Sequence, residues 1–162
     1  MKDFQSKAPN ALARLEPGAR ALYAAYLVLT TLGLLTAALL HLDGLGTSGA
    51  TAAGWWRGDD IATYAKSYRQ LAELTHFHLF TEPVALLVVA HLYVLGSDTP
   101  RRKVVAIVAT AGAIVLQVAL PWVCTYLTGA VGILFLPVHI VLLGGFGYMI
   151  ARAAMDLRGS RT

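Results

Sequence analysis

The 162 residues are 57% hydrophobic and only 14% charged, and the mean hydropathy is +0.61. Soluble domains carry roughly 25% charged and about 45–50% apolar residues, so a water-soluble fold of this length could not cover its apolar surface. The formal net charge of +4 comes from short basic runs beside apolar segments, which argues against a nucleic-acid partner and favours a membrane. The single cysteine, Cys124, excludes an internal disulfide, a multi-cysteine metal centre and a covalently attached c-type haem.

Four apolar runs without lysine or arginine follow one another along the chain, at residues 21–41, 74–96, 104–126 and 130–151. Each is long enough to cross ~30 Å of hydrocarbon as a helix. The runs lack the alternation of barrel strands, and the short links after the second and third run force antiparallel neighbours. The sequence therefore predicts an all-α fold, a transmembrane four-helix up-and-down bundle, forming a single membrane domain over residues 1–162.

The basic residues give the orientation of this bundle. The amino-terminal flank, the link between the second and third helices and the carboxyl-terminal tail hold ten of the 13 basic residues, and the first loop holds only three. The positive-inside rule then predicts a multi-pass protein with both termini in the cytoplasm. The first helix is interpreted as a retained anchor, because its apolar run is longer than the ~7–15 residues typical of a signal peptide.

The first loop, residues 42–73, is the one sizeable segment outside the membrane. Its start at residues 44–54 is rich in glycine, threonine and alanine, which predicts irregular structure. A short amphipathic helix on the outer surface is expected from Asp59 onward, with Ile61, Tyr64, Tyr68 and Leu71 on one face. Aromatic residues in this loop are expected at the depth of the lipid headgroups; they are Trp55, Trp56, Tyr64 and Tyr68.

The histidines are the most informative residues, because all of them lie in or at the edge of the predicted spans. Ionisable groups inside a membrane are costly and usually face the bundle interior with a partner. One such histidine would be read as a hydrogen bond between helices, but a set of five indicates a cofactor. Two histidines on facing helices can hold a b-type haem. The five are His41, His76, His78, His91 and His139.

The depth of each histidine decides which of them could pair. His76 and His91 share one helical stripe and lie about 22 Å apart along the axis, a layout that would suit two haems. His41 is expected level with His76 and His78, and His139 below them, so one haem in the outer half is favoured over two. His76 with His139 is the preferred ligand pair for haem b, and His91 and His41 are the other cofactor-binding candidates.

A second face of the second helix carries His78 and Glu82, which are four residues apart. Glu82 is the only carboxylate within a predicted span, and the pair could accept protons from a quinol or act as a proton relay for a quinone site. The alternative is a buried carboxyl that is hydrogen-bonded or neutral. Gln117 is expected to form an interhelical hydrogen bond, and the adjacent Gly144 and Gly145 are expected to allow close helix packing.

A stretch around the first two helices resembles a known family. It comprises Trp55-Trp56-Arg57-Gly58, then Lys66-Ser67, then Glu73-Leu74-Thr75-His76-Phe77-His78-Leu79-Phe80, with His91 in the same helix. These residues resemble an uncharacterised family of small bacterial four-helix integral membrane proteins. The resemblance implies the four-helix topology and the bacterial inner membrane, but no activity. In architecture alone, the chain is also similar to membrane cytochrome b subunits, which hold haem between histidines.

Two functions of different classes follow from these features. The first is an electron-transfer subunit with a b-type haem, which passes electrons between quinone and an outward-facing redox protein or a larger respiratory complex. The second is a non-redox membrane subunit, in which His41, His76 and His78 bind zinc or copper or the histidines only hydrogen-bond between helices. Since no nucleotide loop or hydrolase signature occurs, a redox subunit is favoured over an independent enzyme.

Overall fold

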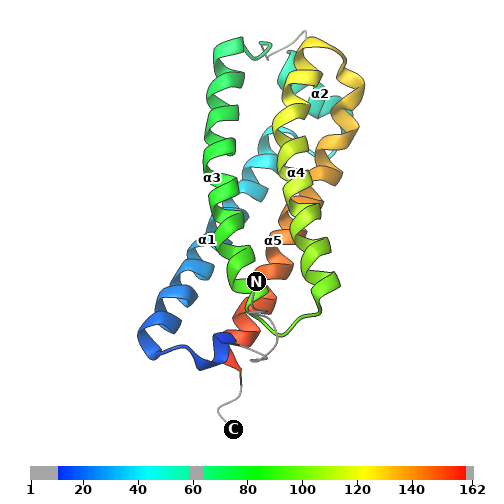
Figure 1. The fold of residues 1–162 in the computed structure, drawn as a ribbon. Coiled ribbons are helices and arrows are strands. Elements are labelled where there is room, and N and C mark those ends of the chain that lie inside the picture. The colour runs from blue at the N-terminus through cyan, green and yellow to red at the C-terminus, as the bar shows by residue number, and fades with distance from the viewer. Residues whose placement is uncertain (1–10, 59–63, 160–162) are drawn as a thin grey trace.

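Residues 11–58 and 64–159 are described in a computed structural model, and four long helices dominate them (Figure 1). These helices are α1 (Pro17–Gly44), α3 (Tyr68–Val94), α4 (Pro100–Tyr126) and α5 (Phe135–Arg158). The first three, and α5 together with the stretch from Gly129 that precedes it, are long and apolar enough to cross a membrane. The predicted all-α bundle of four membrane helices is therefore confirmed.

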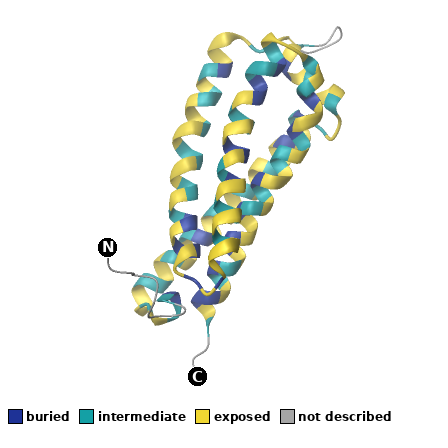
Figure 2. Ribbon diagram, turned by 45° about the vertical axis from the view of Figure 1, so that its right-hand side comes forward, coloured by how far each residue is buried: buried dark blue, intermediate teal, exposed yellow. Residues whose placement is uncertain are grey.

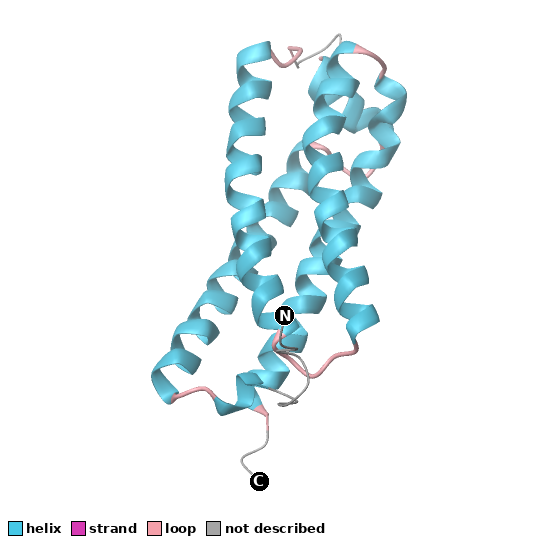
Figure 3. Cartoon of the chain, viewed as in Figure 1, coloured by secondary structure: helices cyan, strands magenta, loops and turns pink. Residues whose placement is uncertain are grey.

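Successive long helices run in opposite directions, which gives the predicted up-and-down arrangement (Figure 3). The start of α1, the link between α3 and α4 and the end of α5 lie together, at the bottom of Figure 1. We call this the terminal end. The opposite end carries two shorter elements, α2 (Gly49–Arg57) and the 3-10 helix η2 (Gly129–Leu134), and we call it the α2 end. A 3-10 turn, η1 (Ala11–Arg14), precedes α1.

The helices are longer than the apolar runs that predicted them, because capping residues set their ends. Pro17 and Pro100 occupy the first turns of α1 and α4, where a missing backbone N–H costs nothing. At the start of α3, Ser67 and Gln70 form a reciprocal capping box six residues before the predicted boundary. The apolar runs at 21–41, 74–96, 104–126 and 130–151 therefore locate the four helices but not all of their ends. Helix α3 ends at Val94, two residues before its run does, and the run 130–151 begins in η2, ahead of α5.

The short amphipathic helix lies earlier in the first loop than predicted. It is α2, which begins inside the stretch 44–54 that was expected to be irregular and continues to Arg57, while Tyr68 and Leu71 belong to the first turn of α3. Ser48 caps α2 by accepting a hydrogen bond from the backbone N–H of Thr51 at 3.1 Å, and the alanines that follow favour a helix. The prediction for residues 59–63 lies outside the described part of the chain.

Trp56, one of the aromatic residues expected at headgroup depth, is buried within the protein. It is 6% exposed and stacks on Phe135 with ring centroids 5.8 Å apart, so it packs α2 against α5. Trp55 beside it is 37% exposed, and Tyr64 and Tyr68 are exposed as expected. The contact of α2 with η2 is so close that a Cβ at Gly132 would collide with the backbone carbonyl of Gly49.

Large apolar side chains remain exposed on the outer faces of the bundle (Figure 2). Examples are Leu32, Phe80, Val108 and Ile140. A water-soluble protein rarely exposes contiguous apolar surface of this extent, whereas hydrocarbon solvates it at no cost. The exposed side chains thus match a surface that faces lipid.

Helix α1 is the least buried of the four and leaves a gap beside α3. Only 11% of its most apolar 18-residue window is buried, against 28% for α4. It packs mainly on α5, and one side-chain hydrogen bond reaches α3, from the Tyr26 hydroxyl to the carbonyl of Ala85 at 3.4 Å. This gap becomes one wall of the site described next.

Candidate functional site

A cavity of about 1070 Å³ lies between the long helices in the half of the bundle nearer α2. Its walls include lipid-exposed residues of α1, such as Gly33 and Ala37, and of α3, such as Phe77 and Val84, so it opens sideways between these two helices. Its lining is mostly apolar, and a few polar side chains converge in it. Ligand sites in proteins commonly combine these properties at about 300–1,000 Å³. The main polar residues are His41, His78, Glu82, Gln117 and His139.

Three of these polar residues form a network across the wall of the cavity. Glu82 Oε1 lies 2.7 Å from His78 Nδ1 and accepts a hydrogen bond from Gln117 Nε2, also at 2.7 Å. The His78 and Glu82 side chains are only 26% and 18% exposed. The predicted shared face of His78 and Glu82 and the predicted interhelical bond of Gln117 are both confirmed.

The network leaves two hydrogen-bond acceptors unused. Glu82 Oε2 and Gln117 Oε1 are both buried, and neither has a partner within residues 11–58 and 64–159. A buried acceptor without a donor costs about 1–3 kcal/mol, so such groups usually indicate a ligand or a water. Both residues line the cavity, but the two oxygens themselves are covered, so a ligand with hydroxyl donors could reach them only if the two side chains turn toward the cavity.

His41 and His139 form a second polar element of the cavity. Their ring centroids are 3.9 Å apart and the ring planes are tilted by 31°. His41 is 6% exposed, and both of its ring nitrogens are buried without a partner in the described part of the chain. The two residues were predicted at different depths, with His41 at the outer surface. They meet because α1 ends beneath α2, below the upper ends of α3 and α4 (Figure 1).

His76 and His91 lie away from the cavity on the outer side of α3. Neither lines the cavity, and His76 stacks on Phe80 with centroids 6.4 Å apart. The structure therefore does not bring His76 to His139, the pair preferred for haem, and it places His91 near the terminal end. The predicted stripe is present, and all of its members are exposed: His76, Phe80, Pro83, Leu87 and His91.

The described residues do not form a ready-made site for haem or for a zinc or copper ion. The lone pairs of an imidazole lie in the ring plane, so the rings of His41 and His139, which face each other with a tilt of 31°, cannot point at one iron from opposite sides without rotating. The residues that the structure describes contain no group of three histidine, cysteine, aspartate or glutamate side chains placed to hold a metal ion. The haem and the zinc or copper site therefore remain predictions.

Sequence reasoning missed a polar cluster at the terminal end. Asp98, whose side chain is 2% exposed, accepts hydrogen bonds from the hydroxyls of Tyr93 and Tyr148, and Arg102 and Arg152 each lie 3.6 Å away. The bond from Tyr148, those from the Thr99 backbone and Tyr93, and the charge of Arg152 outweigh burial and lower the pKa of Asp98 to about 2. The sequence feature that could have indicated this cluster is an aspartate, Asp98, two residues before the start of α4 at Pro100.

The comparisons with known proteins place the chain at the level of a family. A family model described as a transmembrane helical domain matches residues 46–161, which begin just before α2 and include His78, Glu82, Gln117 and His139. Helix α1 and His41 lie outside the matched residues. No curated protein and no solved structure matches the chain.

Proposed function

Because the chain belongs to the family of transmembrane helical domains, we propose that it works inside the bilayer as a redox subunit that binds a quinol. The observation that carries the proposal is the pair of buried, unused acceptors, Glu82 Oε2 and Gln117 Oε1, in the wall of a laterally open apolar cavity. A quinol has two hydroxyl donors on an apolar ring and a long apolar tail. The hydroxyls suit the two oxygens, and the tail suits the gap between α1 and α3.

The chemistry assigned to the chain's own residues is binding and proton transfer. Oxidation of the quinol breaks two O–H bonds, releases two protons and two electrons, and leaves the quinone. Glu82, supported by His78, accepts a proton from the hydroxyl that it binds. The electrons leave one at a time to a carrier on an outward-facing partner protein. In this proposal the protein lies in the bacterial inner membrane with both termini on the cytoplasmic side. The α2 end then faces outward, toward that partner.

Haem b remains a separate part of this proposal. It would supply a one-electron site in the membrane, and His41 or His139 could each offer one imidazole to it. As the rings stand in contact, they do not fit as two opposite ligands. We therefore assign no step to haem, and the visible spectrum of the protein tests for it.

The alternative, a non-redox subunit, is favoured by one observation. The network of His78, Glu82 and Gln117 joins α3 to α4 without any ligand, as purely structural hydrogen bonds would do. The two functions differ in one respect: in the first, Glu82 Oε2 and Gln117 Oε1 accept hydrogen bonds from a bound ligand, and in the second they do not.

Tryptophan fluorescence can decide between them, because Trp55 and Trp56 also line the cavity. A short-tailed ubiquinone or its quinol should quench this fluorescence saturably in the purified protein. Gln117→Leu should weaken binding about tenfold, since it removes one acceptor. Glu73→Gln, which changes an exposed carboxylate of α3, is a control variant that should bind as the wild type does. Quenching that never saturates, or that is equal in Gln117→Leu and the wild type, would contradict quinol binding here.

A further inference from the structure

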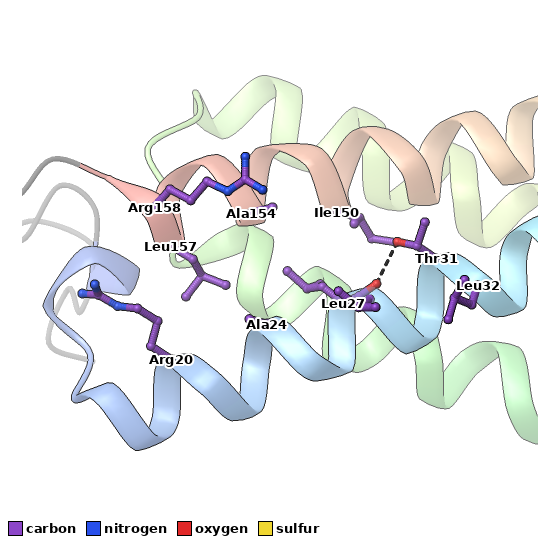
Figure 4. Close-up of a pocket in the computed structure, with 10 residues that line it drawn as sticks. Arg20, Ala24, Leu27, Thr31, Leu32, Ile150, Ala154, Leu157 and Arg158 are labelled. Atoms are coloured by element: carbon purple, nitrogen blue, oxygen red, sulfur yellow. Dashed lines mark hydrogen bonds between the residues drawn. The ribbon is translucent and has the colours of Figure 1, made fainter.

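A second cavity, of about 590 Å³, lies between α1 and α5 near the terminal end (Figure 4). It shares no lining residue with the central cavity, and its walls are mostly aliphatic. Thr31 does not make these walls polar, because its hydroxyl donates to the carbonyl of Leu27 at 2.7 Å. The wall residues include Ala24, Leu27, Leu32, Ile150, Ala154 and Leu157. We call this cavity the α1–α5 groove.

Two arginines stand at one end of the α1–α5 groove. Figure 4 shows Arg20 on α1 and Arg158 on α5 at its terminal end, with Leu157 between them and the two guanidinium groups pointing away from each other. Within the described ranges, neither arginine forms an ion pair with a carboxylate; the pairs there involve Arg69, Arg102 and Arg152. Arg20 Nη2 donates to the carbonyl of Ala13 at 2.8 Å, while its Nε is buried without a partner. The groove therefore combines apolar walls with two arginines that pair with no carboxylate of residues 11–58 and 64–159.

The length of the groove matches one leaflet of a bilayer. Arg20 and Leu32, the outermost lining residues of α1, are twelve positions apart, or about 18 Å of helix. Half of a ~30 Å hydrocarbon core is about 15 Å. An acyl chain that starts at the arginines would thus run along the groove to the middle of the membrane.

The charge at the mouth selects the class of lipid. Guanidinium groups bind phosphate with two parallel hydrogen bonds, and basic pockets between membrane helices on the cytoplasmic side recognise anionic headgroups. We propose that the α1–α5 groove binds an anionic phospholipid, with an acyl chain against the aliphatic walls and its phosphate near Arg20 and Arg158, whose guanidinium groups turn toward it on binding. A zwitterionic lipid fits the walls equally well but carries a cation toward the arginines.

Native mass spectrometry of the purified full chain can test this site. The probes are phosphatidylglycerol and phosphatidylcholine with the same acyl chains. We expect phosphatidylglycerol to bind at least about tenfold more tightly, and Arg20→Gln with Arg158→Gln to remove this preference. The matched control is Arg14→Gln with Arg101→Gln, which removes the same charge from two exposed arginines. The control should keep the preference.

A second variant separates the groove from its charged mouth. Ala24→Phe fills the apolar wall and leaves both arginines, so it should weaken phosphatidylglycerol binding even if the arginine variant folds poorly. Equal binding of the two lipids by the wild type would overturn the proposal, and so would a preference that survives loss of both arginines. Full displacement of the lipid by millimolar inorganic phosphate would also overturn it, because the site would then be one for a free anion.

Discussion

The imidazole rings of His41 and His139 are in contact, although they belong to the first and the last membrane helix. Their centroids lie 3.9 Å apart, and His41 is almost fully buried. This contact ties the end of α1 to α5 at the inner side of the central cavity. It also places the histidine pair beside the His78–Glu82–Gln117 network, since both sets line the same space.

The visible spectrum tests whether this histidine pair serves a haem. A haem held in the cavity by His139 would give absorption bands that His139→Ala abolishes. His76→Ala should leave such bands unchanged, because His76 lies on the exposed side of α3. A protein purified gently from haem-sufficient cells and found colourless would rule out haem, while quinol binding would still have to be judged by fluorescence.

Glu82→Gln should keep the fold and quinol binding but slow quinol oxidation by about 10²-fold, the usual loss when a general base is removed. The amide can still accept a hydrogen bond from the quinol, but it cannot take its proton. The measurement is the rate of reduction of cytochrome c by a short-tailed quinol, corrected for the direct reaction. Glu73→Gln should react at the wild-type rate, and an equal loss in both variants would show that Glu82 has no special role.

Asp98 should make the stability of the terminal end depend on pH. Its pKa is lowered in the folded protein from 3.8 to about 2, so the stabilisation is complete above pH 3.8 and is lost as pH falls toward 2. Thermal unfolding in detergent between pH 5 and pH 2.5 should show this decline. Asp98→Asn should flatten the decline and lower Tm at neutral pH by about 2–4 °C for each kcal/mol lost. An unchanged slope in Asp98→Asn would contradict the prediction.

The neighbouring glycines of α5 should respond oppositely to alanine. A Cβ at Gly145 would collide with the Thr110 hydroxyl on α4, whereas a Cβ at Gly144 meets nothing within 4 Å. Gly145→Ala should therefore destabilise the protein by about 1–3 kcal/mol through overpacking. Gly144→Ala should be neutral or stabilising by up to about 1 kcal/mol, because alanine favours a helix. Equal melting temperatures for the two variants would show that α4 and α5 are not packed this closely.

The orientation can be measured with cysteine labels and a reporter. Ser48→Cys, at the exposed start of α2, should react with an impermeant thiol reagent added outside the cell, while the native Cys124 is buried. A reporter fused after Thr162 should be active only if it functions in the cytoplasm. Labelling of Ser48→Cys from the cytoplasmic side alone would reverse the topology.

The elements that could be predicted from the sequence were those that hydropathy and helical spacing determine. Four apolar runs predicted four spans, and the i, i+4 spacing of His78 and Glu82 placed them together. The position of α2 could not be read from hydropathy, because it depends on the Ser48 cap and on the close approach of Gly49 to Gly132. Its glycine- and threonine-rich composition favoured a loop instead.

The inward face of α3 was not available from its sequence either. In a soluble helix the apolar stripe identifies the buried face, but in a membrane helix the lipid-facing side is apolar as well. The stripe of His76 and His91 and the face of His78 and Glu82 were therefore equally good candidates. The depth estimate for His41 failed for a related reason, since counting residues assumed that every helix reaches the same surface.

Because the cavity opens sideways between α1 and α3, the affinity of a ligand for it is measured against the surrounding lipid and not against water. A long-tailed ligand would reach the cavity by diffusing within the membrane, without ever passing through water. Its occupancy would then follow its mole fraction among the lipids and not its concentration in the aqueous phase. A cavity that binds only a few times better than bulk lipid could be largely filled in a membrane rich in that ligand, and would empty as the composition of the membrane changes.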